Sequence, residues 1–257
     1  FLRPALSVLC QCVHRDSGPT EMLFEIVGVA PLDRFGAADV EKEPLAPVLE
    51  EITQASTGFD IRNCDEITAI TAPNLHTVAG DIDININSAT EITTFDIGSA
   101  GTTPFTARSI ELFGVDTPML GSSFQQATLT YNFVLYGLDS LVASDLDGLN
   151  IVSVDYVRVF NCDALTSFDI EITTTTGRLE IENNALLESI VINTPQDLST
   201  LTTFKLSSNP ALISLGFPSS STLFTSAAST ISGNTALCCA DVQAVVTGHG
   251  TSGCLDG

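Results

Sequence analysis

Two stretches in the C-terminal half share one pattern: LEIENNALLESIVI at residues 179–192 and FKLSSNPALISLGF at residues 204–217. Each has an asparagine at its centre, Asn184 or Asn209. Apolar residues lie five and three positions before this asparagine, and three, six and eight positions after it. Apolar residues that alternate with polar ones over a short run are typical of half-buried β-strands. Each stretch therefore predicts two short strands joined by a turn at the asparagine.

The same pattern recurs along most of the chain at spacings of 22 to 26 residues. Its eight centres are Cys64, Ala89, Val115, Leu138, Cys162, Asn184, Asn209 and Asn234. Ser144 interrupts the copy at Leu138, and the copy at Val115 loses its second half at Pro118 and Gly121. Repeats this short bury their apolar faces only by stacking on neighbouring repeats. We therefore expect an all-β fold, a right-handed parallel β-helix of about eight coils of ~24 residues with small helical caps.

The residues at the centre of the pattern predict a structural ladder. A buried asparagine at a turn can bond open backbone groups of its own coil and of the next one, as expected for Asn184, Asn209 and Asn234. Cys64 and Cys162 take the same position as small buried side chains. They lie four coils apart, roughly 19 Å at the spacing of β-strands. A disulfide needs Cα atoms within about 7 Å, so both are predicted to be buried free thiols.

The two ends of the chain are expected to cap the repeats, because an open end would expose unpaired strand edges. Residues 1–22 are interpreted as an N-terminal extension. Residues 23–58 form a cap with an opening strand at 23–27 and an amphipathic helix at 43–56. Residues 59–237 carry the repeats, and residues 238–257 form a C-terminal cap that begins with a short helix at 239–247.

Cysteines cluster near both ends and are disulfide candidates, namely Cys10, Cys12, Cys238, Cys239 and Cys254. Disulfide-tied caps imply an oxidising environment. The predicted location is therefore extracellular, at a cell surface or cell wall. The spacings of these cysteines are too tight for a standard zinc site.

Composition excludes several classes of function. The 257 residues are 44% apolar and 16% charged, which excludes a disordered chain. Nine Lys and Arg against 31 Asp and Glu give a net charge of −22, which excludes nucleic acid as a partner. No apolar run approaches the ~18 residues of a membrane span, so direct membrane insertion is not expected. The chain has no Trp and three Tyr, which disfavours lectin-like sugar stacking.

Three segments resemble the receptor L-domain family and its fungal cell-wall relatives: LFEIVG at 23–28, PVLEEIT at 47–53 leading into GFDIRN at 58–63, and ISGNTALC at 231–238. Residues 72–84 are similar to the proline–leucine–glycine connection of that family. The resemblance spans residues 23–239. It implies a β-helix with leucine-rich-repeat character, used extracellularly for binding or wall architecture. It carries over no catalytic residue, and eight coils exceed a typical single L-domain.

Other residue patterns offer alternatives. Asp81 and Asp83, with Asn85 and Asn87, face one way and suggest a weak Ca²⁺ site, although a solvated strand face explains them more simply. Pairs of threonines suggest ice binding, but they do not recur at one position of the repeat.

An enzyme acting on polysaccharides is the main alternative. Arg158 and Arg178 lie on adjacent coils with Asp155 and Glu180 nearby, and Gly248-His249-Gly250 is similar to a tripeptide of pectin-cleaving β-helix enzymes. Charge pairing on a sheet surface explains the first set equally well. We therefore expect a non-enzymatic structural, adhesive or binding module. It would present solenoid faces to proteins, glycans or copies of itself, including a filament or layer, and need no cofactor apart from Ca²⁺ at the aspartates.

Overall fold

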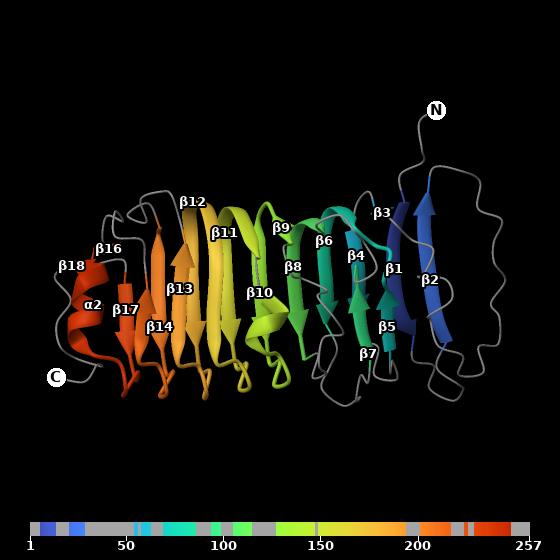
Figure 1. Ribbon diagram of the computed structural model, residues 1–257. Helices are drawn as coiled ribbons and strands as arrows, with labels where there is room; N and C mark the ends of the chain where they lie inside the picture. Colours follow the sequence, from blue (N-terminus) through green and yellow to red (C-terminus); the bar gives the residue numbers. More distant parts are fainter. Residues whose placement is uncertain are drawn as a thin grey trace.

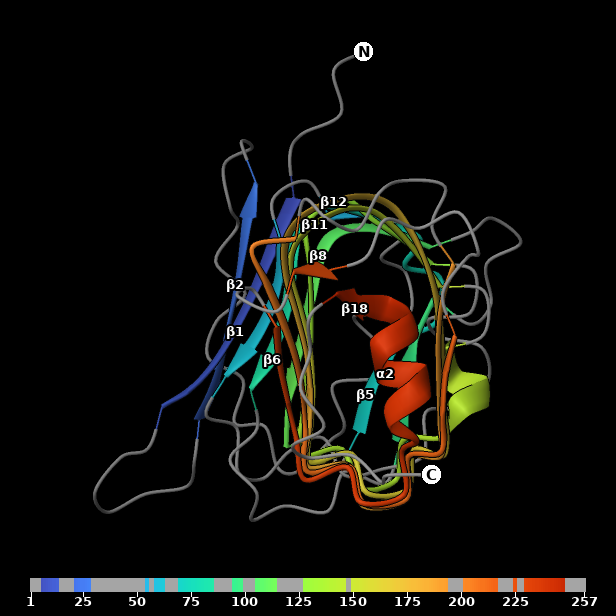
Figure 2. The ribbon, with the colours of Figure 1, turned by 90° about the vertical axis from the view of Figure 1, so that its left-hand side faces the viewer.

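The computed structural model describes residues 6–13, 21–28, 54–55, 58–62, 69–85, 94–98, 105–114, 127–146, 149–193, 201–216, 224–225 and 229–247. These residues form an elongated, all-β solenoid with mostly parallel strands and few helices (Figure 1). Viewed from its end, the chain winds around an enclosed interior, with the short helix α2 (Cys239–Val245) at the C-terminal end (Figure 2).

One sheet runs the length of the molecule, and we call its principal ladder the main sheet. Its strands follow one another in the order β2 (Glu21–Gly28), β1 (Leu6–Val13), β4 (Gly58–Arg62), β6 (Thr77–Asn85), β8 (Thr106–Phe113), β10 (Asn132–Tyr136), β11 (Asn150–Phe160), β12 (Ser167–Glu182), β14 (Thr203–Ser207) and β17 (Ser229–Ser232). Neighbours pair in parallel, except for the antiparallel pair β1 and β2.

The remaining strands form the other walls of the solenoid. The first part of β12 pairs in parallel with β13 (Ser189–Asn193), which pairs with β15 (Ser214–Gly216). The shorter pieces are β3 (Gln54–Ala55), β5 (Ala69–Ala72), β7 (Thr94–Ile97), β9 (Thr128–Leu129), the 3₁₀ helix η1 (Ala143–Leu146), β16 (Phe224–Thr225) and β18 (Val246–Thr247). About four turns can be followed from β10 to β17. The predicted eight coils are not confirmed, since the chain between the earlier strands lies partly outside the described residues.

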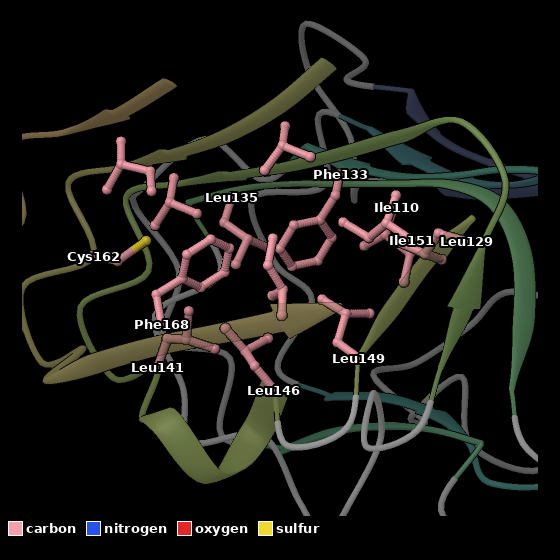
Figure 3. Packing of buried hydrophobic residues seen from close by; sticks show 14 of the residues in the cluster. Ile110, Leu129, Phe133, Leu135, Leu141, Leu146, Leu149, Ile151, Cys162 and Phe168 are labelled. Atoms are coloured by element: carbon pink, nitrogen blue, oxygen red, sulfur yellow. The ribbon is translucent and has the colours of Figure 1, made fainter. Parts of the chain in front are cut away.

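Apolar side chains from successive turns fill one continuous interior (Figure 3). Phe133 pairs with Val157, and Leu135 with Val159, so equivalent residues of the repeat lie on neighbouring strands. The rings of Phe133 and Phe168 stack across the interior at 6.5 Å between centroids. Each fully buried side chain of this size stabilises the fold by ~1.5–3 kcal/mol, so the column of apolar residues holds the turns together.

The residue before each of the last six centres of the repeat has a left-handed backbone conformation. These residues are Gly114, Gly137, Asn161, Asn183, Ser208 and Gly233. Glycine and asparagine adopt this conformation at least cost, which explains their frequency at this position. The turn between the two strands of a repeat is therefore encoded by two adjacent residues, the left-handed residue and the centre.

The predicted copy at Ala89 is half right. On its second strand, Ile70 pairs with Phe95, as the centres at Cys64 and Ala89 require. On its first strand, Ile82 pairs with Ile110 and Ile84 with Leu112, two residues earlier than predicted. The copy therefore holds two extra residues between its strands. Isoleucine occupies positions 82, 84 and 86, so the apolar pattern alone could not distinguish the two registers.

Four other elements differ from expectation. The copy at Leu138 has η1 in place of a second strand, where Ser144 breaks the apolar alternation. The helix predicted at 43–56 is wrong at its end, because Gln54–Ala55 pairs with β6 as β3, and residues 43–53 lie outside the described part. The predicted C-terminal helix ends at Val245, and residues 246–247 form β18. Residues 6–13, placed in the N-terminal extension, form β1.

Candidate functional site

The centres of the last repeats form a buried hydrogen-bonded ladder. The backbone N–H of Cys162 donates to Asn184 Oδ1 at 2.9 Å, that of Asn184 to Asn209 Oδ1 at 3.1 Å, and that of Asn209 to Asn234 Oδ1 at 3.0 Å. Each asparagine Nδ2 also donates to a carbonyl of the preceding coil, at 2.9 to 3.3 Å. All four side chains are fully buried. These residues hold the turns together and present nothing to a ligand.

The described cysteines divide into structural and accessible ones. Cys162 is a free thiol, and burial raises its pKa to about 12, which makes it a poor nucleophile. Of the adjacent disulfide candidates, Cys239 is disulfide-bonded, whereas Cys238 is a half-buried free thiol. Cys10 and Cys12 lie on β1, where Cys10 is in register with Ile61. The side chains of these two, and all of Cys64 and Cys254, lie outside the described residues.

The outward side of the main sheet, together with the corner at which β8 and β11 bend, differs from the other walls; we call this surface the main face. All five Lys and Arg residues that follow residue 42 belong to the strands of the main sheet: Arg62, Arg108, Arg158, Arg178 and Lys205. All three tyrosines of the chain, Tyr131, Tyr136 and Tyr156, lie on or beside its strands β10 and β11. The same strands also carry acidic residues, among them Glu111, Glu180 and Glu182, so this face combines charges of both signs with the tyrosines.

Three aromatic rings form a strip across neighbouring strands of the main face. Phe113 and Tyr136 have ring centroids 6.0 Å apart, and Tyr136 and Phe160 lie 4.8 Å apart with planes inclined by 14°. The Arg158 guanidinium covers the ring of Phe160 at 4.9 Å, a cation–π contact. Because the rings cover one another's faces, the strip presents mainly ring edges outward. Tyr136 is 37% exposed, the most accessible of the three.

A charge network lies beside the strip. Lys205 Nζ is 2.6 Å from Glu182 Oε2, and Ser207 Oγ donates to the same oxygen at 3.0 Å. Arg158 lies between Glu180 and Glu182, at 3.8 and 3.7 Å. The Tyr156 hydroxyl donates to Glu180 at 2.9 Å. Partial burial and this hydrogen bond raise the pKa of Tyr156 to about 12. The network fixes the positions of charges that would otherwise be mobile on a surface.

A shallow hollow of about 420 Å³ lies where β11 and β12 bulge. Its lining residues are Asn132, Asp155, Tyr156, Gly177, Arg178 and Thr202. A Cβ atom at Gly177 would overlap the backbone of Asp155, so only glycine lets the two strands approach here. Thr202 donates through its backbone N–H at 2.8 Å and its hydroxyl at 3.0 Å to the Gly177 carbonyl.

The structure brings some predicted site residues together and separates others. Arg158 and Glu180 form an ion pair, and Asp155 and Arg178 line the same hollow. Asp81 pairs with Arg108 at 3.0 Å, and because Ile82 between them is buried, Asp81 and Asp83 share the outward side of the strand. Among the described residues, no group of three or more His, Cys, Asp or Glu side chains could hold a metal ion. His249 lies outside them.

Among the described residues, threonines are in register at two places: on β6, β8 and β9, and on β16 and β18, where Thr225 pairs with Thr247. Thr77, Thr106 and Thr128 are in register on β6, β8 and β9, and the hydroxyls of Thr77 and Thr106 lie 3.5 Å apart. These hydroxyls therefore interact with each other.

Sequence reasoning missed the aromatic strip. Phe113, Tyr136 and Phe160 each lie two positions before a centre of the repeat, in three successive copies. Examination of the outward positions of the repeat, rather than the apolar ones alone, would have revealed this column.

The fold and the main face together define a β-solenoid with one aromatic, mixed-charge face. Comparisons with protein-family models, curated proteins and solved structures found no match to the chain. Within the described ranges, no helix has the length and apolar character needed to cross a membrane.

Proposed function

We propose that this chain is a non-enzymatic extracellular binding module that recognises a protein partner through the main face. One observation carries the proposal: every Lys and Arg beyond residue 42 belongs to the sheet that bears this face, as do Tyr136 and Tyr156, and Tyr131 directly precedes its strand β10. Tyrosine and arginine are enriched in protein interfaces and dominate their binding energy. The use of a solenoid wall for binding also agrees with the resemblance to receptor L-domains.

Other occupants fit the main face less well. A glycan stacks on exposed ring faces, but in the aromatic strip the neighbouring rings cover these faces. A second copy of the chain carries the same net charge of −22, and this repulsion opposes association at low salt. Ca²⁺ could bridge two acidic copies, so self-association into a filament or layer predicts faster sedimentation in millimolar Ca²⁺ than in chelator.

An enzyme acting on polysaccharides is the second candidate, because Asp155 and Arg178 line one hollow. Glu180 and Glu182 are less suited to acid–base chemistry, since Tyr156, Arg158 and Lys205 already engage them. Incubation with polyuronates and neutral glucans separates the two functions. Release of reducing ends would overturn the binding proposal.

A comparison of two double variants on an array of extracellular proteins tests the role of the main face. Tyr136→Ser/Phe160→Ser removes most of the aromatic strip. Leu186→Ser/Ile213→Ser removes two exposed apolar residues outside the main face, at 55% and 58% exposure. We expect wild-type signals to persist in the second variant and to fall at least ~10-fold in the first, the effect of losing a binding hot spot. Equal signals from both variants, at unchanged melting temperature, would exclude the strip as the binding surface.

A further inference from the structure

The hollow at the bulge of β11 and β12 holds charges of both signs that do not pair with each other. Arg178 and Asp155 are both exposed and both line it. Among the described residues no carboxylate lies within ion-pair distance of Arg178, whereas Arg108, Arg158 and Lys205 all have acidic partners. Arg178 is thus the one cation with a described side chain on this sheet that has its full charge available to a ligand.

Asn132 also lines the hollow, but its side chain is turned to the protein: Nδ2 donates to Glu111 Oε1 at 3.3 Å, and Oδ1 is shielded from solvent and so out of reach of a ligand. The hollow therefore offers a ligand one cation, the Arg178 guanidinium, and one carboxylate, that of Asp155.

These groups are held in place before any ligand arrives. The backbone of Gly177 packs against Asp155, and two hydrogen bonds from Thr202 fix the Gly177 carbonyl. The Asp155 carboxylate lies near the Tyr131 hydroxyl and raises the pKa of Tyr131. A site whose charges are already positioned loses little entropy on binding.

We infer that the hollow binds a small zwitterion, of which an L-α-amino acid is the simplest class. The ligand carboxylate lies against the Arg178 guanidinium, which can bind it through two parallel N–H donors. The ligand ammonium lies against the Asp155 carboxylate. A zwitterion has no net charge, so the acidic protein does not repel it as it repels a simple anion. The volume of about 420 Å³ accommodates a small ligand with room for a side chain.

This inference is independent of the protein partner proposed above. Tyr156 and Phe160 are four residues apart on β11, roughly 13 Å at the rise of a β-strand, so the hollow and the aromatic strip are separate sites. A variant of one can therefore be used without removing the other.

The test is an NMR titration of the full chain with a panel of L-α-amino acids, their amides, and the corresponding carboxylic acids that lack the amine. We expect saturable shifts of the Gly177, Arg178 and Thr202 amide signals with amino acids, and none with the other two sets at the same concentration. Binding by the amides or the acids alone, or no saturable shift with any amino acid, would overturn the inference.

Four variants assign the roles. Arg178→Gln and Asp155→Asn each remove one ligand contact and should weaken binding at least ~10-fold, as for a lost charged hydrogen bond. Lys205→Gln and Glu188→Gln make the same changes in net charge outside the hollow and should leave the affinity unchanged. Arg178 is exposed, so its variant is expected to fold. Unchanged affinity in folded Arg178→Gln would exclude the site.

Discussion

Substitution of Asn209 by alanine should destabilise the protein more than its small change in volume suggests. Asn209 Oδ1 accepts from the backbone N–H and from Nδ2 of Asn184, at 3.1 and 3.0 Å, and Asn209 Nδ2 donates to the Ile181 carbonyl at 3.0 Å. All of these groups are buried, so water cannot replace the lost partner. At ~1–3 kcal/mol for each group left without a partner, with partial relaxation, the expected loss is about 4 kcal/mol in the free energy of unfolding.

Urea denaturation followed by far-ultraviolet circular dichroism measures this loss. Asn193→Ala is the matched control, because Asn193 is exposed and its side chain makes one hydrogen bond, to Asp169 at 2.8 Å. This control should lose less than ~0.5 kcal/mol, as is usual for surface substitutions. A loss below about 1 kcal/mol for Asn209→Ala, with an unchanged denaturant slope, would refute the view that the ladder holds the turns together.

Three further outcomes follow from the structure. Alkylation of the native protein should label Cys238 quickly and leave Cys162 unmodified, because burial raises the pKa of Cys162 to about 12. Peptide mass mapping identifies the modified cysteines, and equal labelling of the two would contradict this expectation. The pKa of Tyr156 is raised from 10.0 to about 12, so its contribution to stability is complete below pH 10 and is lost as the pH rises through about 12. Tyr156→Phe should therefore flatten the fall in melting temperature between pH 10 and pH 12. An unchanged profile of melting temperature against pH would contradict the assignment. Gly177→Ala should lower the free energy of unfolding by roughly 3 kcal/mol, because its Cβ would overlap the Asp155 backbone. Gly216→Ala is the control and should lower it far less, since a Cβ there meets only ordinary contacts. Similar melting temperatures of the two variants would show that the bulge can relax.

The apolar positions of the repeat were enough to predict a stacked β-solenoid. Alternation around Asn184 and Asn209 fixes which side chains are buried, and the constant spacing fixes that the strands stack. The observed register of β11, β12 and β14 follows that alignment beyond the bulge, where Val157 pairs with Leu179 and Leu179 with Phe204. The prediction failed where the pattern is degenerate, as in the isoleucines at 82, 84 and 86, and where a polar residue such as Ser144 turns a strand into η1.

The candidate sites were harder to predict, because they depend on which outward residues meet across coils. Asp155 and Arg178 are 23 positions apart in sequence, and the hollow between them exists because the bulge at Gly177 shifts the pairing of β11 and β12. A repeat pattern with a constant register contains no bulge, so it could not predict this hollow. The aromatic strip lies in constant register and could have been predicted, but only from the outward positions of the repeat, which the apolar pattern leaves out.

The direction of the buried ladder has a consequence for how the chain is made on the ribosome. The turn at Cys162 is closed by an asparagine 22 residues later, Asn184, and the turns at Asn184 and Asn209 by asparagines 25 residues later, Asn209 and Asn234. A nascent chain therefore cannot complete a turn until the following one has emerged, and a fragment that stops before residue 234 leaves its last turn open. Removing one whole period between these asparagines would restore the same bonds, so the length of the rod can change in steps of one repeat without redesign of the turns.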